Sequence, residues 1–361
     1  MEVQIPLCQN AVVEFNMSKL VIILPKLWKA NSIASVIAIA YTVLPSIIPS
    51  VLAAALSTSL CSALPSIAAE TQQVRTITFP EDRSYGTIIK LEPNWNIFVR
   101  HPKGSFFAEA RGKVQYSAKD ALMLSARFPL TDNPAVMKKL PADSFQYITF
   151  LNLPAEDKIF EPLTHLTGLR RIDFQEGEFQ DKAFAELAKL VNLEAISVRE
   201  CFVTGDSLTH FGVLKKLRAM VWKKVALDWK LLNQSSTVFP AMADLQFSDT
   251  NLDDEGMNWL EKMPNLRQLS IDGSSRVTDR GLLILKKLKK LKKLELKKMK
   301  AVTPKGIMQL KGGSIEAIHV GDANYTQLEI KQIKDAMPKV QFLFDKKKMK
   351  EGTMEIFAPL H

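Results

Sequence analysis

A six-residue pattern of apolar positions, apolar-x-x-apolar-x-apolar, recurs along most of the chain. Alternation of this kind over a few residues predicts a strand with one buried face. A fixed period of two dozen residues predicts a stack of short repeats, with one strand in each. The first positions of the pattern, 24 or 25 residues apart, are Phe145, Leu169, Leu193, Leu217, Met242, Leu266, Leu291 and Ile315.

The second half of each repeat predicts a short helix. Residues 277–282 read Val-Thr-Asp-Arg-Gly-Leu, in which Thr278 is a suitable N-cap and Asp279 suits the positive end of the helix dipole. Thr303 precedes a proline at the first helical position, and Thr326 with Glu329 predicts a capping box. The same order of residues recurs at Val203-Thr204, Leu227-Asp228 and Leu252-Asp253.

With these strands and helix starts, residues 121–344 resemble the leucine-rich-repeat family, with about eight repeats of 24–25 residues and capping strands near Leu124 and Leu343. The Val-Thr-Asp-x-Gly-Leu entry is similar to that of the ribonuclease-inhibitor-like and F-box-associated subclass and of related bacterial repeat proteins. The resemblance implies an α/β leucine-rich-repeat solenoid, a horseshoe with a parallel concave β-sheet and convex helices. An asparagine ladder is not expected, because the position after the strand holds Gly177, Cys201, Val225, Thr250, Ser274 and Met299.

The widths of the elements give the same curvature. Parallel strands stack about 4.8 Å apart, whereas helices need about 8–10 Å, so the sheet forms the inner side. Nine strands would give a concave surface roughly 40 Å long, which is too extended for a small-molecule pocket. Such surfaces are used to hold macromolecules, and the sequence therefore predicts a protein that binds another protein.

Side chains between the buried strand positions are expected to face solvent on the concave side. We expect Tyr147 and Arg171 to be the strongest contacts, because aromatic residues and arginine often anchor interfaces. The alternative is an ordinary solvated strand surface. The candidate residues are Tyr147, Arg171, Asp173, Gln175, Arg199, Lys223, Asp244, Gln246, Gln268, Asp272, Lys293, Lys297 and His319, and Thr149 and Glu295 share the same alternation.

Residues 70–120 lie outside the repeat and predict a small β-rich N-terminal cap. Segments 87–91, 96–100 and 112–116 carry the β-branched and aromatic residues of short strands, separated by proline and glycine. Such a cap would cover the first open edge of the stack. A separate small binding domain is the alternative.

Residues 1–69 predict export from the cytoplasm. No charged residue occurs between Lys29 and Glu70, and residues 32–60 are strongly apolar. Small residues near Ala69 suit signal-peptide cleavage, and a start at Met17 would give an n-region of ordinary length. An uncleaved membrane anchor through residues 32–60 is the alternative. Both interpretations place the repeats outside the cytoplasm, in a periplasmic, extracellular or membrane-anchored protein.

The net charge of +10 changes this picture little. Nine lysines fall within residues 286–300 and four within a basic tail of residues 345–361, so the rest of the chain is close to balanced. Nucleic acid is not an expected partner. Attachment of the Lys286–Lys300 edge to an anionic polymer or lipid surface is an alternative function, and a structural envelope component is another.

Candidate chemistry is sparse. Cys8, Cys61 and Cys201 are too scattered for a disulfide framework, and we expect Cys201 to be buried and unreactive. The histidines show no spacing with other ligands that predicts a metal site, and no cofactor is expected. No nucleophile elbow, P-loop or dinucleotide fingerprint occurs, so the sequence does not indicate an enzyme.

Overall fold

The computed structural model describes residues 5–7, 11–13, 73–99, 102–323 and 325–345. The chain divides into two units, residues 1–71 and 72–361, and in the first unit β1 (Ile5–Leu7) pairs antiparallel with β2 (Ala11–Val13). The predicted apolar export segment, Ala69 and the basic tail from residue 346 lie outside the described residues. Within the described part, no helix is both long and apolar enough to cross a bilayer.

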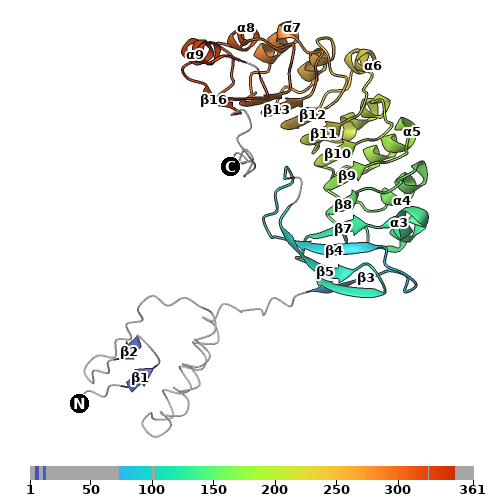
Figure 1. The fold of residues 1–361 in the computed structure, drawn as a ribbon. Coiled ribbons are helices and arrows are strands. Elements are labelled where there is room, and N and C mark those ends of the chain that lie inside the picture. The colour runs from blue at the N-terminus through green and yellow to red at the C-terminus, as the bar shows by residue number, and fades with distance from the viewer. Residues whose placement is uncertain (1–4, 8–10, 14–72, 100–101, 324, 346–361) are drawn as a thin grey trace, which may run out of the picture. The chain divides into compact units, whose positions relative to one another are not determined.

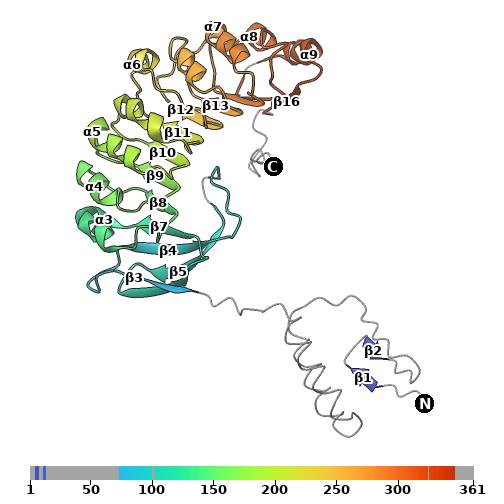
Figure 2. The same cartoon turned by 180° about the vertical axis from the view of Figure 1, so that it is seen from behind.

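The strands of the second unit confirm the predicted α/β leucine-rich-repeat solenoid. A 12-stranded sheet runs in the order β16 to β7, then β4 and β5, with β7 to β16 all parallel. The strands line the inner side of a curved stack and the helices its outer side (Figures 1 and 2). The parallel strands are β7 (Leu122–Ala126), β8 (Tyr147–Phe150), β9 (Arg171–Gln175), β10 (Ala195–Arg199), β11 (Ala219–Lys223), β12 (Asp244–Ser248), β13 (Gln268–Asp272), β14 (Lys293–Lys297), β15 (Ala317–Gly321) and β16 (Gln341–Phe344).

The convex side contains short helices, many of them tight 3-10 helices rather than the expected α-helices. A repeat of 24 residues leaves room for only one or two turns after its strand, which suits the narrower helix. The α-helices are α3 (Phe128–Asp132), α4 (Phe160–Leu163), α5 (Asp181–Phe184), α6 (Trp229–Gln234), α7 (Asp279–Leu282), α8 (Pro304–Met308) and α9 (Gln327–Ala336). The 3-10 helices are η1 (Pro134–Lys139), η2 (Asp157–Ile159), η3 (Ala185–Lys189), η4 (Asp206–Val213), η5 (Gly256–Lys262) and η6 (Leu283–Lys287).

The predicted helix starts are confirmed where an α-helix forms. Thr278 and Thr303 cap α7 and α8, Asp228 caps α6, and Thr326 forms the expected capping box with Glu329 at α9. At the remaining two sites, near residues 204 and 253, the chain enters the 3-10 helices η4 and η5 instead.

The β-rich segment before the repeats covers the edge of β7. β4 (Gly86–Leu91) pairs antiparallel with β7, and β5 (Gly104–Glu109) pairs with β4. β3 (Val74–Thr78) and β6 (Lys113–Ser117) form a separate antiparallel pair. Figures 1 and 2 both show the connection between β4 and β5 on the concave side of the stack. Its described residues 92–99 are called the concave loop below.

The expectation of a strand at residues 96–100 is wrong for the described residues 96–99, which form a turn. The backbone N–H of Val99 donates to the carbonyl of Asn96 at 3.1 Å, and the N–H of Phe98 donates to the Asn96 side chain at 2.9 Å. The apolar residues here, such as Ile97, face the sheet of the repeats. A turn that packs on a sheet needs apolar side chains, as a strand does, so the composition of this segment is the same in both cases.

A relay of carboxylates joins successive repeats. Asp254 accepts hydrogen bonds from the backbone N–H of Thr278 at 2.7 Å and of Gly281 at 3.1 Å, one repeat later. A Cβ added to Gly281 would lie 2.4 Å from the Asp254 carboxylate, which explains the glycine of the Thr-Asp-x-Gly motif. Asp279 repeats the arrangement by accepting from the backbone N–H of Thr303 at 2.8 Å.

Asp181 is the most heavily bonded member of this relay. It accepts from the backbone N–H groups of Thr204 at 2.6 Å and Ser207 at 3.0 Å, and from both of their hydroxyls. Burial opposes ionisation of this carboxyl, but the hydrogen bonds from Thr204 and Ser207 outweigh it and leave the pKa of Asp181 below its usual value. The charged form therefore stabilises the fold at neutral pH.

We expect Asp181→Ala to lower the free energy of unfolding by about 2 kcal/mol at pH 7, because the backbone N–H groups of Thr204, Gly205 and Ser207 lose their acceptor. The loss should shrink as the pH falls, since a carboxyl with a lowered pKa contributes its stability above the unfolded pKa and loses it on protonation. Urea unfolding at pH 7 and in acid measures both effects. Asp206→Ala is the control, because Asp206 is exposed. Equal losses in the two variants would contradict the relay.

Candidate functional site

The concave side chains form rows across the sheet, because the strands pair in register. One row contains Tyr147, Arg171, Ala195, Ala219, Asp244, Gln268 and Lys293. A second contains Thr149, Asp173, Ser197, Val221, Gln246, Ser270, Glu295 and His319. A third contains Gln175, Arg199, Lys223, Ser248, Asp272 and Lys297.

The concave loop covers the first part of these rows. The ring of Trp95 stacks on that of Tyr147, with centroids 6.2 Å apart and an interplanar angle of 6°. Ile97 packs against Ala195 and Ala219, and Phe98 packs against the same cluster. The two alanines matter because a longer side chain at either position would occupy the space that the loop fills.

A buried ion pair fixes the loop to the sheet. The Arg171 guanidinium donates to both oxygens of Asp173, at 2.8 and 2.9 Å, and each side chain is 4% exposed. The same guanidinium donates to the carbonyls of Ile97 at 2.7 Å and Val99 at 2.5 Å. The hydroxyl of Tyr147 also donates to Asp173, at 2.9 Å, and burial raises the pKa of that hydroxyl.

The expectation that Tyr147, Arg171 and Asp173 face solvent is therefore wrong. They occupy concave positions, but a segment some 70 residues earlier in the chain folds over them. Thr149 and Arg199 are also buried. Any binding role for these residues stays a prediction, and it requires the concave loop to be displaced.

Most of the remaining candidates lie on the concave face of β12 to β16, and two, Gln175 and Lys223, lie at the ends of β9 and β11. We call the concave positions of these five strands, together with Asp345, the open half. Its side chains are half-buried or exposed, apart from the buried His319. Gln175 and Lys223 lie half-buried in the row at the carboxyl ends of β9 and β11. The open half includes the candidates Asp244, Gln246, Gln268, Asp272, Lys293, Lys297 and His319, together with Glu295.

Glu295 is the centre of a polar cluster in the open half. It accepts from the Ser270 hydroxyl and the Lys297 ammonium, both at 2.6 Å, and lies 3.0 Å from Nδ1 of His319. Burial opposes its ionisation, but Lys297, Ser270 and His319 together hold the pKa of Glu295 below its usual value. Nε2 of His319 lies 2.7 Å from Asp345, a residue that the sequence places in the tail.

This cluster does not form a nucleophile with its base. The hydroxyl of Ser270 donates to a carboxylate, and both ring nitrogens of His319 face carboxylates. A serine nucleophile needs a base strong enough to take its proton, and the carboxylate of Glu295 is a weak base because its pKa is held below the usual value. Within the described part of the chain, no group of three or more candidate ligands could hold a metal ion. The geometry suits an ordered polar contact surface.

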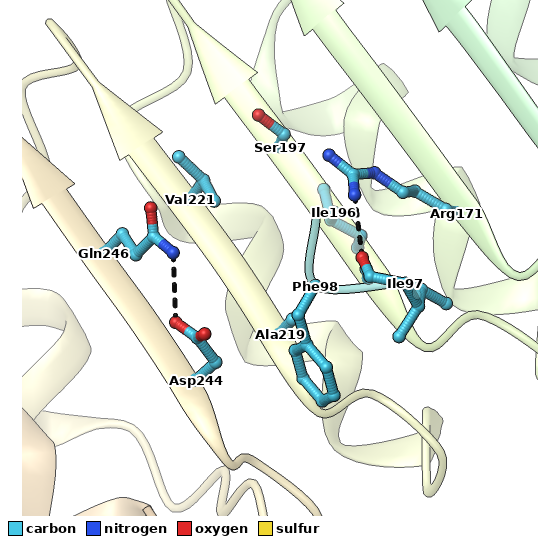
Figure 3. Close-up of a pocket in the computed structure, with 10 residues that line it drawn as sticks. Ile97, Phe98, Arg171, Ile196, Ser197, Ala219, Val221, Asp244 and Gln246 are labelled. Atoms are coloured by element: carbon cyan, nitrogen blue, oxygen red, sulfur yellow. Dashed lines mark hydrogen bonds between the residues drawn. The ribbon is translucent and has the colours of Figure 1, made fainter. Parts of the chain in front are cut away.

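Asp244 lies where the concave loop meets the open half. Its carboxylate accepts from the side-chain amide of Gln246 at 3.2 Å, the one hydrogen bond it makes within the described part of the chain. Burial raises the pKa of Asp244 to about 6, and the nearby negative charge of Glu295 also acts to raise it. The hydrogen bond from Gln246 acts to lower it. Figure 3 shows Asp244 and Gln246 beside Ala219 and Phe98 of the neighbouring elements.

A small cavity of about 20 Å³ lies between the loop and these strands. It has room for about one water molecule. Its lining residues include Phe98 from the loop, Ser197 and Val221 from the second row, and the Asp244–Gln246 pair. Asp244 and Gln246, which belong to the open half, line one side of the cavity, and the cavity is too small for an organic cofactor.

The lysines of residues 286–300 do not form one surface. Lys287 is the last residue of η6 and contacts Glu261 at 2.8 Å, and Lys290 lies on the turn after η6 and contacts Asn265 at 2.6 Å. Lys293 and Lys297 face the concave side, and Lys298 pairs with Asp272 at 3.2 Å beyond the strand. This distribution does not favour a single basic edge.

Cys201 is buried beneath the turn after β10, as expected. Its thiol donates to the carbonyl of Arg199 at 3.1 Å and accepts from the N–H of Gly177 at 3.3 Å. Burial raises the pKa of the thiol to about 11, so the nucleophilic thiolate is scarce at neutral pH.

No protein-family model matches the chain, and no curated protein is a significant sequence match. Among solved structures, an internalin from Listeria monocytogenes str. 4b F2365 is 14% identical with a TM-score of 0.39, over 64% of this chain and 60% of the internalin. A leucine-rich-repeat protein from Leptospira interrogans is 14% identical with a TM-score of 0.32, over 58% and 62%. TLR13 in its complex with ssRNA13 is 13% identical with a TM-score of 0.40, over 62% and 38%.

This chain therefore spans less than two thirds of each of these proteins. No role of an individual residue is carried over from them.

We expect Asp244→Asn to raise the free energy of unfolding by about 1–2 kcal/mol at pH 7 and to change it little at pH 4. The folded protein binds a proton at Asp244 more tightly than the unfolded chain does, so ionisation costs stability above pH 6 and nothing below about pH 4. Urea unfolding of both proteins at the two pH values measures the difference. Asp272→Asn, which removes a carboxylate paired with Lys298, is the control and should not stabilise the fold. A gain confined to pH 4 would contradict the assignment.

Proposed function

We propose that this chain is an exported, non-enzymatic scaffold that binds a protein partner through the open half of its concave sheet. The observation that carries the proposal is the position of the concave loop, which covers β8 to β11 and leaves the polar rows of β12 to β16 accessible. A regular array of half-buried side chains of both signs is suited to recognition of an extended protein surface.

The side chains of the polar rows are held in place by their neighbours, which supports a binding role for the open half. Glu295 is held by three neighbours, and Asp272 pairs with Lys298. Side chains fixed in this way lose little conformational entropy when a partner binds. The open half is therefore pre-organised for a polar interface.

Export rests on the sequence of residues 1–69, in which a long apolar segment is followed by small residues around Ala69. We propose cleavage there, with a retained membrane anchor as the alternative. Intact mass and N-terminal sequencing of fractionated host cells separate the two. A mature chain that begins near Glu70 supports cleavage, and a full-length cytoplasmic protein would overturn export.

The binding proposal is tested with a triple variant, Gln268→Ala/Lys293→Glu/Lys297→Glu, which alters neighbouring positions of the open half without touching the buried apolar rows. Partners are isolated from the exterior of the native host with the wild-type chain, and affinities are then measured by calorimetry. We expect the triple variant to bind at least tenfold more weakly, because it disrupts several contacts at the centre of the interface.

The matched control is Lys286→Glu/Lys289→Glu, which reverses the same number of charges at exposed positions in the last turn of η6 and directly after it. It should bind like the wild type and keep the wild-type melting temperature. The triple variant also breaks the Lys297–Glu295 ion pair, so its binding is measured well below its own melting temperature. Loss of binding in the control, with none in the triple variant, would instead favour an anionic surface that contacts the lysine-rich turn.

A further inference from the structure

Asp244 differs from the other acidic side chains of the concave rows. Asp173 pairs with Arg171, Glu295 with Lys297, and Asp272 with Lys298. Asp244 forms no ion pair with the residues that the structure describes and is held only by the amide of Gln246 at 3.2 Å. Two cations share its row. Lys293, whose charge acts to lower the pKa of Asp244, lies two strands away, about 10 Å along the sheet, and Arg171 lies three strands away on the other side.

A half-buried carboxylate without a cation is costly for a fold, because desolvation penalises its charged form. The pKa of Asp244 is raised by burial for this reason. Groups that are poorly compensated in the free protein concentrate at sites where a ligand supplies the missing partner. For Asp244, the missing partner is a positive charge.

The surroundings determine which kind of cation fits. Phe98, Ile97 and Val221 form an apolar wall on the side of the concave loop, and Gln246 and Ser197 offer further hydrogen-bonding groups. The Phe98 ring already accepts one cation, since the guanidinium carbon of Arg218 lies 5.1 Å from its centroid. A bare metal ion is disfavoured, because the described residues offer no set of three ligands.

We propose that the junction between the concave loop and β12 is a binding site for a lysine or arginine side chain of the protein partner, with Asp244 as its counter-ion. The methylene stem of that side chain packs on Phe98 and Val221, and Gln246 offers its amide oxygen beside the carboxylate. Arg171 also lines the cavity, but its charge is balanced by Asp173 and its donors are committed to Asp173, Ile97 and Val99.

The site also explains why the residue at position 219 is small. Ala219 pairs with Asp244 on the neighbouring strand and belongs to the cluster on which Phe98 packs, and its short side chain leaves room above the strand. The inferred cation would approach over Gln268 of β13, from the open half. This inference rests on the proposed function, because it supplies the chemistry of one partner residue at the same surface.

The test uses the full chain and two small probes, N-acetyl-lysine methylamide and its uncharged isostere N-acetyl-norleucine methylamide. Binding is followed by NMR through the side-chain amide of Gln246 and the backbone N–H groups of β11 and β12. We expect the lysine probe to shift these signals saturably, and the norleucine probe to bind at least tenfold more weakly. Asp244→Asn should weaken binding of the lysine probe at least tenfold.

Asp272→Asn is the matched control, because it neutralises a concave carboxylate that already has a lysine partner. It should bind the lysine probe like the wild type. Asp244→Asn is nearly isosteric, so unchanged signals elsewhere in its spectrum verify its fold. Equal affinity for the two probes, or unaltered binding of the lysine probe to Asp244→Asn, would overturn the proposal.

The failure of this inference is distinguishable from failure of the proposed function. If the triple variant loses the partner while Asp244→Asn ignores the lysine probe, the open half binds a partner through other chemistry, and the inference alone is overturned. If the lysine probe requires Asp244 but the triple variant retains the partner, the cation site stands and the proposed interface is wrong.

Discussion

The buried Arg171–Asp173 pair is the interaction on which the available surface of this molecule depends. The removal of two charges from water is repaid only when both are paired and their remaining donors and acceptors are satisfied. Here Tyr147 and the carbonyls of Ile97 and Val99 complete those bonds. The carbonyls belong to the concave loop, so the hydrogen bonds of the ion pair are complete only when the loop lies over β8 to β11. The same closure leaves β12 to β16 as the accessible part of the concave sheet.

Rigid spacing of the strands is the second requirement for a surface of this kind. The carboxylates of Asp181, Asp254 and Asp279 each tie the helical start of one repeat to that of the next, and so link three pairs of neighbouring repeats. Each link bonds backbone N–H groups, so it fixes the distance between repeats regardless of the side chains on the concave face. The concave residues can therefore vary in chemistry while the strands keep their register. Asp244 is an example, because its ionised carboxylate lowers the free energy of unfolding and the strands still keep their register.

Periodicity in the sequence predicted the solenoid, the strand register and the capped helices at Thr278, Thr303 and Thr326, because those features depend on local patterns. The covering of Tyr147 and Arg171 could not be predicted in this way. It depends on contacts between residues separated by some 50 to 75 positions, and the apolar residues of the loop suggest a strand. Asp345 was assigned to the tail for a similar reason, since only the folded chain brings it to His319. Trp95 and Phe98 carried the one available signal, an aromatic pair in a segment that lies outside the repeat.

The division of the concave sheet into a covered and an open part is tested most directly by the reactivity of single cysteines. Ser197→Cys and Gln268→Cys are introduced separately into the full chain with Cys8 and Cys61 changed to serine, and the rate of reaction with a small thiol reagent is measured. Ser197 is 1% exposed beneath the loop, whereas Gln268 is half-buried on the open side. We expect the cysteine at position 197 to react at least tenfold more slowly than the one at position 268. Equal rates would contradict it, because the concave loop would then not cover the sheet.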